Sequence, residues 1–128
     1  MKLLLDTHIL LWMVYDPERV SDAARNLIGS EDNSLVFSVA SLWEIAIKAS
    51  PRRAGFDIDP RVLRRALLDD GHQELMITSE HALATIELPQ IHSDPFDRLL
   101  IAQAMVEGIT LLTADTKVVR YPGPILWV

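Results

Sequence analysis

Four acidic residues lie far apart in this sequence, but each stands where an expected strand ends or an expected helix begins. Asp6 ends an apolar run and Asp115 lies just beyond another, whereas Glu44 and Asp97 fall in the first turns of two expected helices. Carboxylates brought within a few ångströms repel each other by about 4 kcal/mol per close pair at an effective dielectric near 20. Either several of them are protonated, or a divalent cation lies among them. Oxygen ligands favour Mg²⁺ or Mn²⁺ over zinc, and such a centre could activate water for hydrolysis.

Each acid, taken alone, also has a purely structural interpretation. Asp94 and Asp97 suit the N-cap and the first turn of a helix, where negative charge is favourable. Asp6 and Asp115 suit turns in which a short side chain bonds the backbone after a strand. The joint pattern of four acids is what favours the metal site.

The structural interpretation of Glu44 takes two forms. Glu44 could close a capping box with Ser41, in the pattern S-x-x-E. It could instead pair with Lys48 at i, i+4 on the polar side of its helix.

The elements that must position these acids alternate between short apolar runs and helical patterns. Strands are expected at residues 2–5, 35–37, 75–77, 109–112 and 125–127. Helices are expected from about residue 9, at 21–28 and 42–49, from Pro60 towards Asp70, at 79–85 with Ser79 as a candidate N-cap, and from Asp94 to Glu107 with Gly108 as its C-cap. The alternation predicts an α/β fold with a mostly parallel sheet of about four or five strands.

In an open parallel sheet the ligand site lies in the crevice outside the carboxyl ends of the strands. Asp6 and Asp115 follow two such ends, so their carboxylates converge if those two strands are neighbours. Glu44 and Asp97 face the same strand tips from their helices.

Composition limits the class of protein. The chain has 128 residues, of which 49% are hydrophobic and 23% are charged, and it contains no cysteine. These values predict one globular domain over residues 1–128 and exclude disulfides, thiolate metal sites and a cysteine nucleophile. No stretch approaches the roughly 20 apolar residues of a membrane span, so we expect a cytoplasmic location and no membrane partner.

Three segments resemble one known family. The N-terminal L-L-L-D-T-H-I-L-L-W, the internal S-L-W-E-I-A-I-K, and D-P-F-D-R-L-L-I-A-Q-A followed by L-L-T-A-D are similar to PIN-domain ribonucleases of the VapC toxin type. The resemblance covers nearly the whole chain. It implies a PIN-like α/β/α sandwich and a metal-dependent endoribonuclease with Mg²⁺ or Mn²⁺ as cofactor. It also implies a cognate VapB-like antitoxin, an RNA substrate and a homodimer.

The resemblance also assigns roles to residues. Asp6, Glu44, Asp97 and Asp115 match the family's four acidic positions, and Asp94 is a candidate fifth. We expect Asp6, Asp97 and Asp115 to be the metal ligands, and Glu44 to be an outer ligand or the group that orients or deprotonates the attacking water. Thr7, Asp94 and Thr113 are expected to hydrogen-bond the metal ligands or the attacking water without binding the ion themselves.

RNA needs positive charge that the acidic site lacks. The segment from Lys48 to Arg65 has six basic residues against two acidic ones, a local charge of +4 in a chain of net charge −6. We therefore expect RNA contacts from this segment, although its helical residues could equally form a solvated face. The expected contacts are Lys48, Arg52, Arg53, Arg64 and Arg65.

The histidines and tryptophans are expected to have structural rather than catalytic roles. The four histidines show no metal-type spacing with one another, so structural roles are expected for them. The three tryptophans are expected in the core or at a dimer interface. The alternatives to a toxin are a housekeeping PIN-type RNA-processing nuclease and a catalytically inert PIN-fold binding module.

Overall fold

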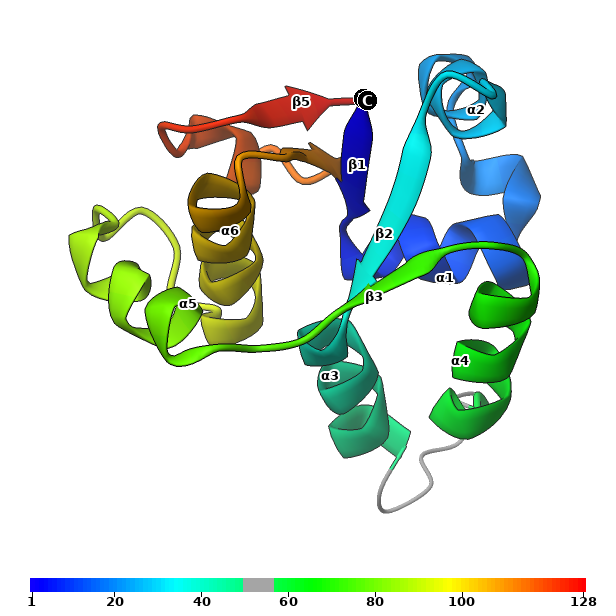
Figure 1. Cartoon of the computed structure of the whole chain (residues 1–128), viewed down its shortest axis with the longest axis horizontal. Coiled ribbons are helices and arrows are strands. Elements are labelled where there is room, and N and C mark those ends of the chain that lie inside the picture. The colour runs from blue at the N-terminus through cyan, green and yellow to red at the C-terminus, as the bar shows by residue number, and fades with distance from the viewer. Residues whose placement is uncertain (50–56) are drawn as a thin grey trace.

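The computed structural model describes residues 1–49 and 57–128, and within them lies a five-stranded sheet whose paired strands all run parallel. The strand order is β3-β2-β1-β4-β5, so the first strand lies at the centre (Figure 1). The strands are β1 (Lys2–Leu5), β2 (Ser34–Ser38), β3 (Gln73–Leu75), β4 (Thr110–Thr113) and β5 (Ile125–Trp127).

Helices connect the strands, as parallel pairing requires. They are α1 (Thr7–Tyr15), α2 (Asp22–Gly29), α3 (Val39–Ala49), α4 (Pro60–Asp69), α5 (Ser79–Ala84) and α6 (Pro95–Glu107). Short 3₁₀ turns are η1 (Pro17–Arg19), η2 (Thr85–Glu87) and η3 (Val118–Arg120). Among the described residues, no helix combines the length and the apolar character needed to cross a bilayer.

The sheet separates two apolar cores because successive strand residues point to opposite faces. Leu4 and Leu111 pack with α6 residues, while the following residues Leu5 and Leu112 pack with α1, α3 and α4 residues. Figure 1 shows α5 and α6 on one side of the sheet and α1, α2 and α4 on the other. The α/β/α arrangement expected from the sequence is confirmed.

The two central strands place the first acid beside the end of β4. Leu5 pairs with Leu112, and the backbone N–H of Asp6 donates to the Leu112 carbonyl at 3.0 Å. The strands that precede Asp6 and Asp115 are therefore neighbours, which was the condition for their convergence.

Around β3 and α5, two details of the sequence prediction were wrong. The strand expected at residues 75–77 is Gln73–Leu75, because pairing with β2 ends at Leu75, and Met76 is 61% exposed. The N-cap of α5 is Thr78 rather than Ser79, since the Thr78 hydroxyl accepts from the His81 amide at 3.2 Å. Residues 50–56 lie outside the described part of the chain, and Pro60 opens α4 as expected.

Candidate active site

The carboxyl edge of the sheet carries the residues that the sequence analysis singled out. Asp6 follows β1 and Asp115 follows β4. Glu44 lies in α3, the helix that directly follows β2. Asp97 lies in the first turn of α6. Each position follows from a strand end or a helix start.

Asp6 is buried, with 2% of its surface exposed, and both of its carboxylate oxygens are bonded. Oδ1 accepts from the His8 amide at 2.8 Å, which makes Asp6 the N-cap of α1. Oδ2 accepts from the Thr113 hydroxyl at 2.7 Å. The structural role considered for Asp6 is thus present, and Thr113 fixes the remaining oxygen in a defined direction.

Glu44 is 4% exposed, which is unusual for a helix carboxylate. Its Oε2 lies 3.0 Å from Lys48 Nζ, so the i, i+4 pair is present, whereas Ser41 lies within α3 and is not its N-cap. Glu44 Oε1 is buried without a hydrogen-bond partner among the described residues. An unpaired buried carboxylate oxygen is costly, and a bound cation or a bound water would satisfy it.

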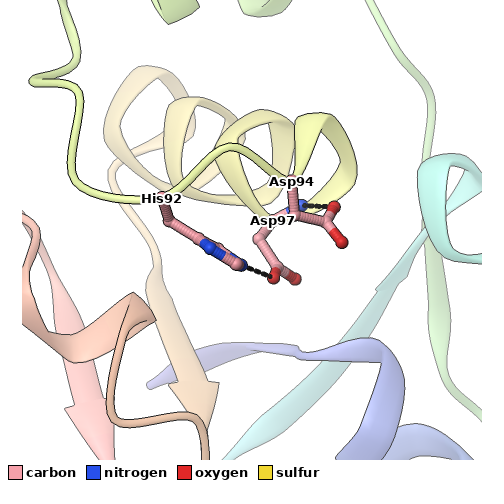
Figure 2. Close-up of side chains that lie close together, drawn as sticks. All are labelled: His92, Asp94 and Asp97. Carbon is pink, nitrogen blue, oxygen red and sulfur yellow. Dashed lines mark hydrogen bonds and ion pairs between the residues drawn. The ribbon is translucent and has the colours of Figure 1, made fainter.

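Asp97 lies in a tight group with two neighbours at the start of α6. His92 Nε2 donates to Asp97 Oδ2 at 2.9 Å, and Asp94 Oδ1 accepts from the Asp97 amide at 3.1 Å (Figure 2). Among the described residues, His92, Asp94 and Asp97 offer ligand atoms that all lie within 4.8 Å of one another. This trio could hold a cation, and it shares only Asp97 with the four acids expected from the sequence.

Burial raises the pKa of Asp97 to about 6, with further contributions from the negative charges of Asp6, Asp94 and Glu44. The hydrogen bond from His92 acts in the opposite direction. Asp97 therefore lies close enough to Asp6 and Glu44 for their negative charges to raise its pKa. The pKa of His8 is also raised, chiefly by its side-chain interaction with Asp6.

Asp115 joins the group indirectly, through Thr113. The Thr113 hydroxyl donates to Asp6 and accepts from the Asp115 amide at 3.0 Å. Asp115 itself is half-buried, and its Oδ1 accepts from the Lys117 amide at 2.7 Å. The turn role considered for Asp115 is therefore present as well.

Of the remaining expected residues, Thr113 and Asp94 each form a hydrogen bond with one of the acids, whereas the Thr7 hydroxyl does not. Thr113 contacts Asp6, but the Thr7 hydroxyl is bonded to Ser41 Oγ at 2.8 Å. Asp94 caps α6 as expected and lies beside Asp97.

The basic residues expected to contact RNA are placed unevenly. Lys48 is paired with Glu44 inside the site, and Arg64 is paired with Glu74 at 2.6 Å. Arg65 is exposed on α4, while Arg52 and Arg53 lie outside the described residues. RNA contact by these residues stays a prediction.

His92 is the site residue that the sequence analysis missed. Spacing among the four histidines gave no signal, because the partner of His92 is a carboxylate five positions later rather than another histidine. The proximity of His92 to Asp97 depends on the turn that precedes the N-cap residue Asp94. A search for histidines within one turn of an expected helix start would have found it.

The donors that gather here are mainly carboxylate oxygens, with one imidazole at the margin. Oxygen donors suit Mg²⁺ and Mn²⁺, and Mn²⁺ also accepts a nitrogen ligand. A cation would satisfy the unpaired Glu44 Oε1 and would offset the negative charges that raise the pKa of Asp97. The residues present therefore fit a divalent metal ion.

Comparison with known proteins gives two sequence matches. A family model described as "PIN domain" matches residues 3–124. Ribonuclease VapC22 of Mycobacterium tuberculosis (strain ATCC 25618 / H37Rv) is 32% identical over 125 residues, which cover 95% of each chain.

Solved structures share the fold at lower sequence identity. A chain of VapBC2 from Rickettsia felis, crystallised with a DNA fragment from its promoter, superposes with a TM-score of 0.76 at 17% identity, covering 100% of this chain and 99% of that one. A chain of DNA-bound VapBC from Salmonella typhimurium gives a TM-score of 0.66 at 19% identity, with 98% and 97% covered. At these identities the likeness supports the fold alone.

Proposed function

The chain belongs to the PIN domain family, and from that premise we propose that it is a metal-dependent endoribonuclease that acts as the toxin of a toxin–antitoxin pair. Its substrate would be RNA in the cytoplasm, and its reaction would be hydrolysis of a phosphodiester bond. The relative with 32% identity is called a ribonuclease, which supports the assignment of the reaction.

One observation carries the catalytic part of this proposal. Glu44, buried at 4% exposure with an unpaired Oε1, lies near Asp6 and Asp97 at the carboxyl edge of a parallel sheet. A fold gains no stability from gathering carboxylates in this way, because burial and repulsion both oppose it. Such an arrangement is typical of sites whose function needs the charges together.

We assign Asp6, Asp97 and Asp115 as the residues that would hold Mg²⁺ or Mn²⁺, directly or through water. When bound, the ion supplies positive charge to the phosphoryl oxygens and lowers the pKa of a water molecule. Asp6 follows β1, Asp115 follows β4 and Asp97 lies in α6, so oxygen donors from three separate parts of the chain can surround one position.

The other residues position these carboxylates. Thr113 fixes Oδ2 of Asp6, and His92 fixes Oδ2 of Asp97, which leaves Asp97 Oδ1 as the oxygen directed away from His92. Glu44 is assigned as the acceptor that orients or deprotonates the attacking water, because Oε1 is unpaired. Lys48 holds the other oxygen of Glu44 and keeps that side chain in place.

The proposal includes two partners. The structural neighbours from Rickettsia felis and Salmonella typhimurium are VapBC complexes, which supports a small antitoxin as the partner that blocks the acidic site. A homodimer is proposed as well, since Trp43 and Trp127 are each 57% exposed and large exposed aromatic residues are enriched at interfaces.

Expression of the wild type beside Asp6→Asn tests both halves of the proposal. Asparagine keeps an acceptor for the α1 N-cap but removes the charge, so the fold should persist while metal binding is lost. The wild type should arrest growth and generate new RNA ends that Asp6→Asn does not generate. Purified wild type should produce the same ends with Mg²⁺ or Mn²⁺ and none with a chelator.

Two results would contradict the proposal. RNA cleavage that persists in Asp6→Asn would place the chemistry elsewhere. Cleavage without growth arrest, together with the lack of a small reading frame immediately upstream, would favour a housekeeping nuclease over a toxin.

A further inference from the structure

A polar pocket adjoins the acidic site on the side of α6 where His92 lies. Its volume is about 340 Å³, within the range of about 300–1,000 Å³ that is usual for ligand sites. It is lined by Gln90, Ile91, His92, Ser93, Lys117 and Arg120. No acidic side chain is among these lining residues, so the pocket differs in charge from the site beside it.

Two hydrogen bonds join this pocket to two of the acids. His92 lines the pocket and donates to Asp97 Oδ2 at 2.9 Å (Figure 2). Lys117 lines it as well, and its backbone N–H donates to Asp115 Oδ1 at 2.7 Å. The pocket therefore directly adjoins Asp97 and Asp115.

The walls of the pocket are fixed to one another. The Tyr121 hydroxyl accepts from the His92 amide at 2.8 Å and donates to the His92 carbonyl at 3.0 Å. Arg98 donates to the same hydroxyl at 3.0 Å and to the Pro89 carbonyl at 2.8 Å. The loop before α6 and the segment around η3 are thus held together, which makes the pocket a preformed feature.

The cations in the pocket are available for a ligand. Lys117 and Arg120 are exposed, and neither side chain makes an ion pair with the described part of the chain. Lys48 and Arg64, by contrast, are already paired with Glu44 and Glu74. The acids and the net charge of −6 repel the phosphates of RNA. Unpaired cations next to the acids are therefore the groups best placed to offset this repulsion.

A second pocket of similar size provides the comparison. It has a volume of about 330 Å³ and includes Ser34 and Gln73, the first residues of β2 and β3, so it lies at the opposite edge of the sheet. Its lining contains Glu31 and Asp70 and no lysine or arginine. Size alone does not distinguish the two pockets, but charge and position do.

We propose that the pocket containing Lys117 and Arg120 is a phosphate subsite, which holds the backbone of the RNA strand next to the bond that is cut. The inference rests on the proposed ribonuclease function and adds the path of the substrate. Lys117 and Arg120 bind the backbone, while Gln90 and Ser93 add neutral hydrogen-bonding groups to the pocket lining.

The test compares the wild type with Lys117→Gln/Arg120→Gln, using a labelled single-stranded RNA of mixed sequence in a chelating buffer that prevents cleavage. Loss of two phosphate contacts should reduce the slope of log K against log salt by about 1.4 and weaken binding roughly 10- to 30-fold near 0.1 M salt. In cleavage assays with Mg²⁺ or Mn²⁺, KM should rise by a similar factor while kcat changes little. Thermal unfolding should show that the double variant is folded.

Lys2→Gln/Arg25→Gln is the matched control, since it also removes one lysine and one arginine. Lys2 begins β1 at the opposite edge of the sheet, and Arg25 is on α2. This control should keep the wild-type slope and KM. Arg64→Gln/Arg65→Gln completes the series, because these residues were the sequence-based expectation.

The outcomes separate the subsite from the function. A wild-type enzyme that cleaves RNA, combined with unchanged slope and KM in Lys117→Gln/Arg120→Gln, overturns the subsite and leaves the function intact. Loss confined to Arg64→Gln/Arg65→Gln, or no binding of RNA by the wild type, overturns it too. Binding that weakens as expected in a protein that cleaves no RNA supports the subsite and contradicts the function.

Discussion

The carboxylate of Asp97 is buried near three other acids, and within the described part of the chain the one side chain that donates a hydrogen bond to it is His92, at 2.9 Å. Folding therefore makes ionisation of this group harder than it is in the unfolded chain, and its pKa rises to about 6. Between about pH 4 and pH 6 the folded state binds more protons here than the unfolded state. Ionised Asp97 consequently lowers the free energy of unfolding as pH rises through that interval.

Asp97→Asn should remove this cost in metal-free protein. The difference in free energy of unfolding, variant minus wild type, should increase between about pH 4 and pH 6 and level off above. A gain of roughly 1–2 kcal/mol is expected, since two pKa units correspond to about 2.7 kcal/mol and solvent screens part of it. Urea unfolding in a chelating buffer across this pH interval measures it.

The same comparison in an Asp6→Asn background provides the control. The negative charge of Asp6 contributes to the raised pKa of Asp97, so the increase with pH should become smaller there. If the difference in free energy of unfolding between Asp97→Asn and the wild type did not change with pH, Asp97 would not be held among ionised acids.

Sequence reasoning could locate Asp6 and Asp115 because strand ends are visible as the ends of apolar runs. It could not show that Glu44 is buried with an unpaired oxygen, since the spacing of Glu44 and Lys48 suits a solvated helix face equally well. It also missed His92, whose approach to Asp97 depends on a turn rather than on a repeat.

At the scale of elements, α6 was the most predictable helix because both of its ends carry specific chemistry. Asp94 accepts from the Phe96 and Asp97 amides, Pro95 follows at the first helical position, and Gly108 ends the helix at φ +66°. The edge strand β3 was misplaced because its first residues, Gln73 and Glu74, are polar, and pairing with β2 outweighs the apolar pattern. Edge strands carry a weaker apolar signal than central strands.

Gly108→Ala should lower the free energy of unfolding by about 1–2 kcal/mol, because an L side chain at this left-handed position is strained. The Cβ would meet no atom within 4 Å, so the cost lies in the backbone alone. Chemical denaturation with an unchanged m-value would measure the effect.

Gly29→Ala is the matched control at the end of α2. Its Cβ also meets no atom within 4 Å, and its φ is not positive. The free energy of unfolding should stay the same or rise by up to about 1 kcal/mol. Equal losses in Gly108→Ala and Gly29→Ala would contradict the assignment of the αL cap.

At the scale of the whole molecule, the sheet separates two edges with different roles. The carboxyl edge carries the acids and, beside them, the pocket with Lys117 and Arg120. The amino edge carries a pocket of similar volume whose charged side chains are acidic. The class of fold was predictable because strands and helices alternate along the chain, but this distribution of pockets depends on loops that periodicity does not describe.

The proposed reaction depends on a cation held among the acids, and the position of that cation can be located directly. Crystals soaked in Mn²⁺ and measured near the manganese absorption edge should show an anomalous peak in contact with carboxylate oxygens of Asp6 and Asp97. Crystals of Asp6→Asn treated in the same way should lack that peak. An ion found away from both aspartates, or no ion in the wild type at a concentration that supports RNA cleavage, would contradict the account.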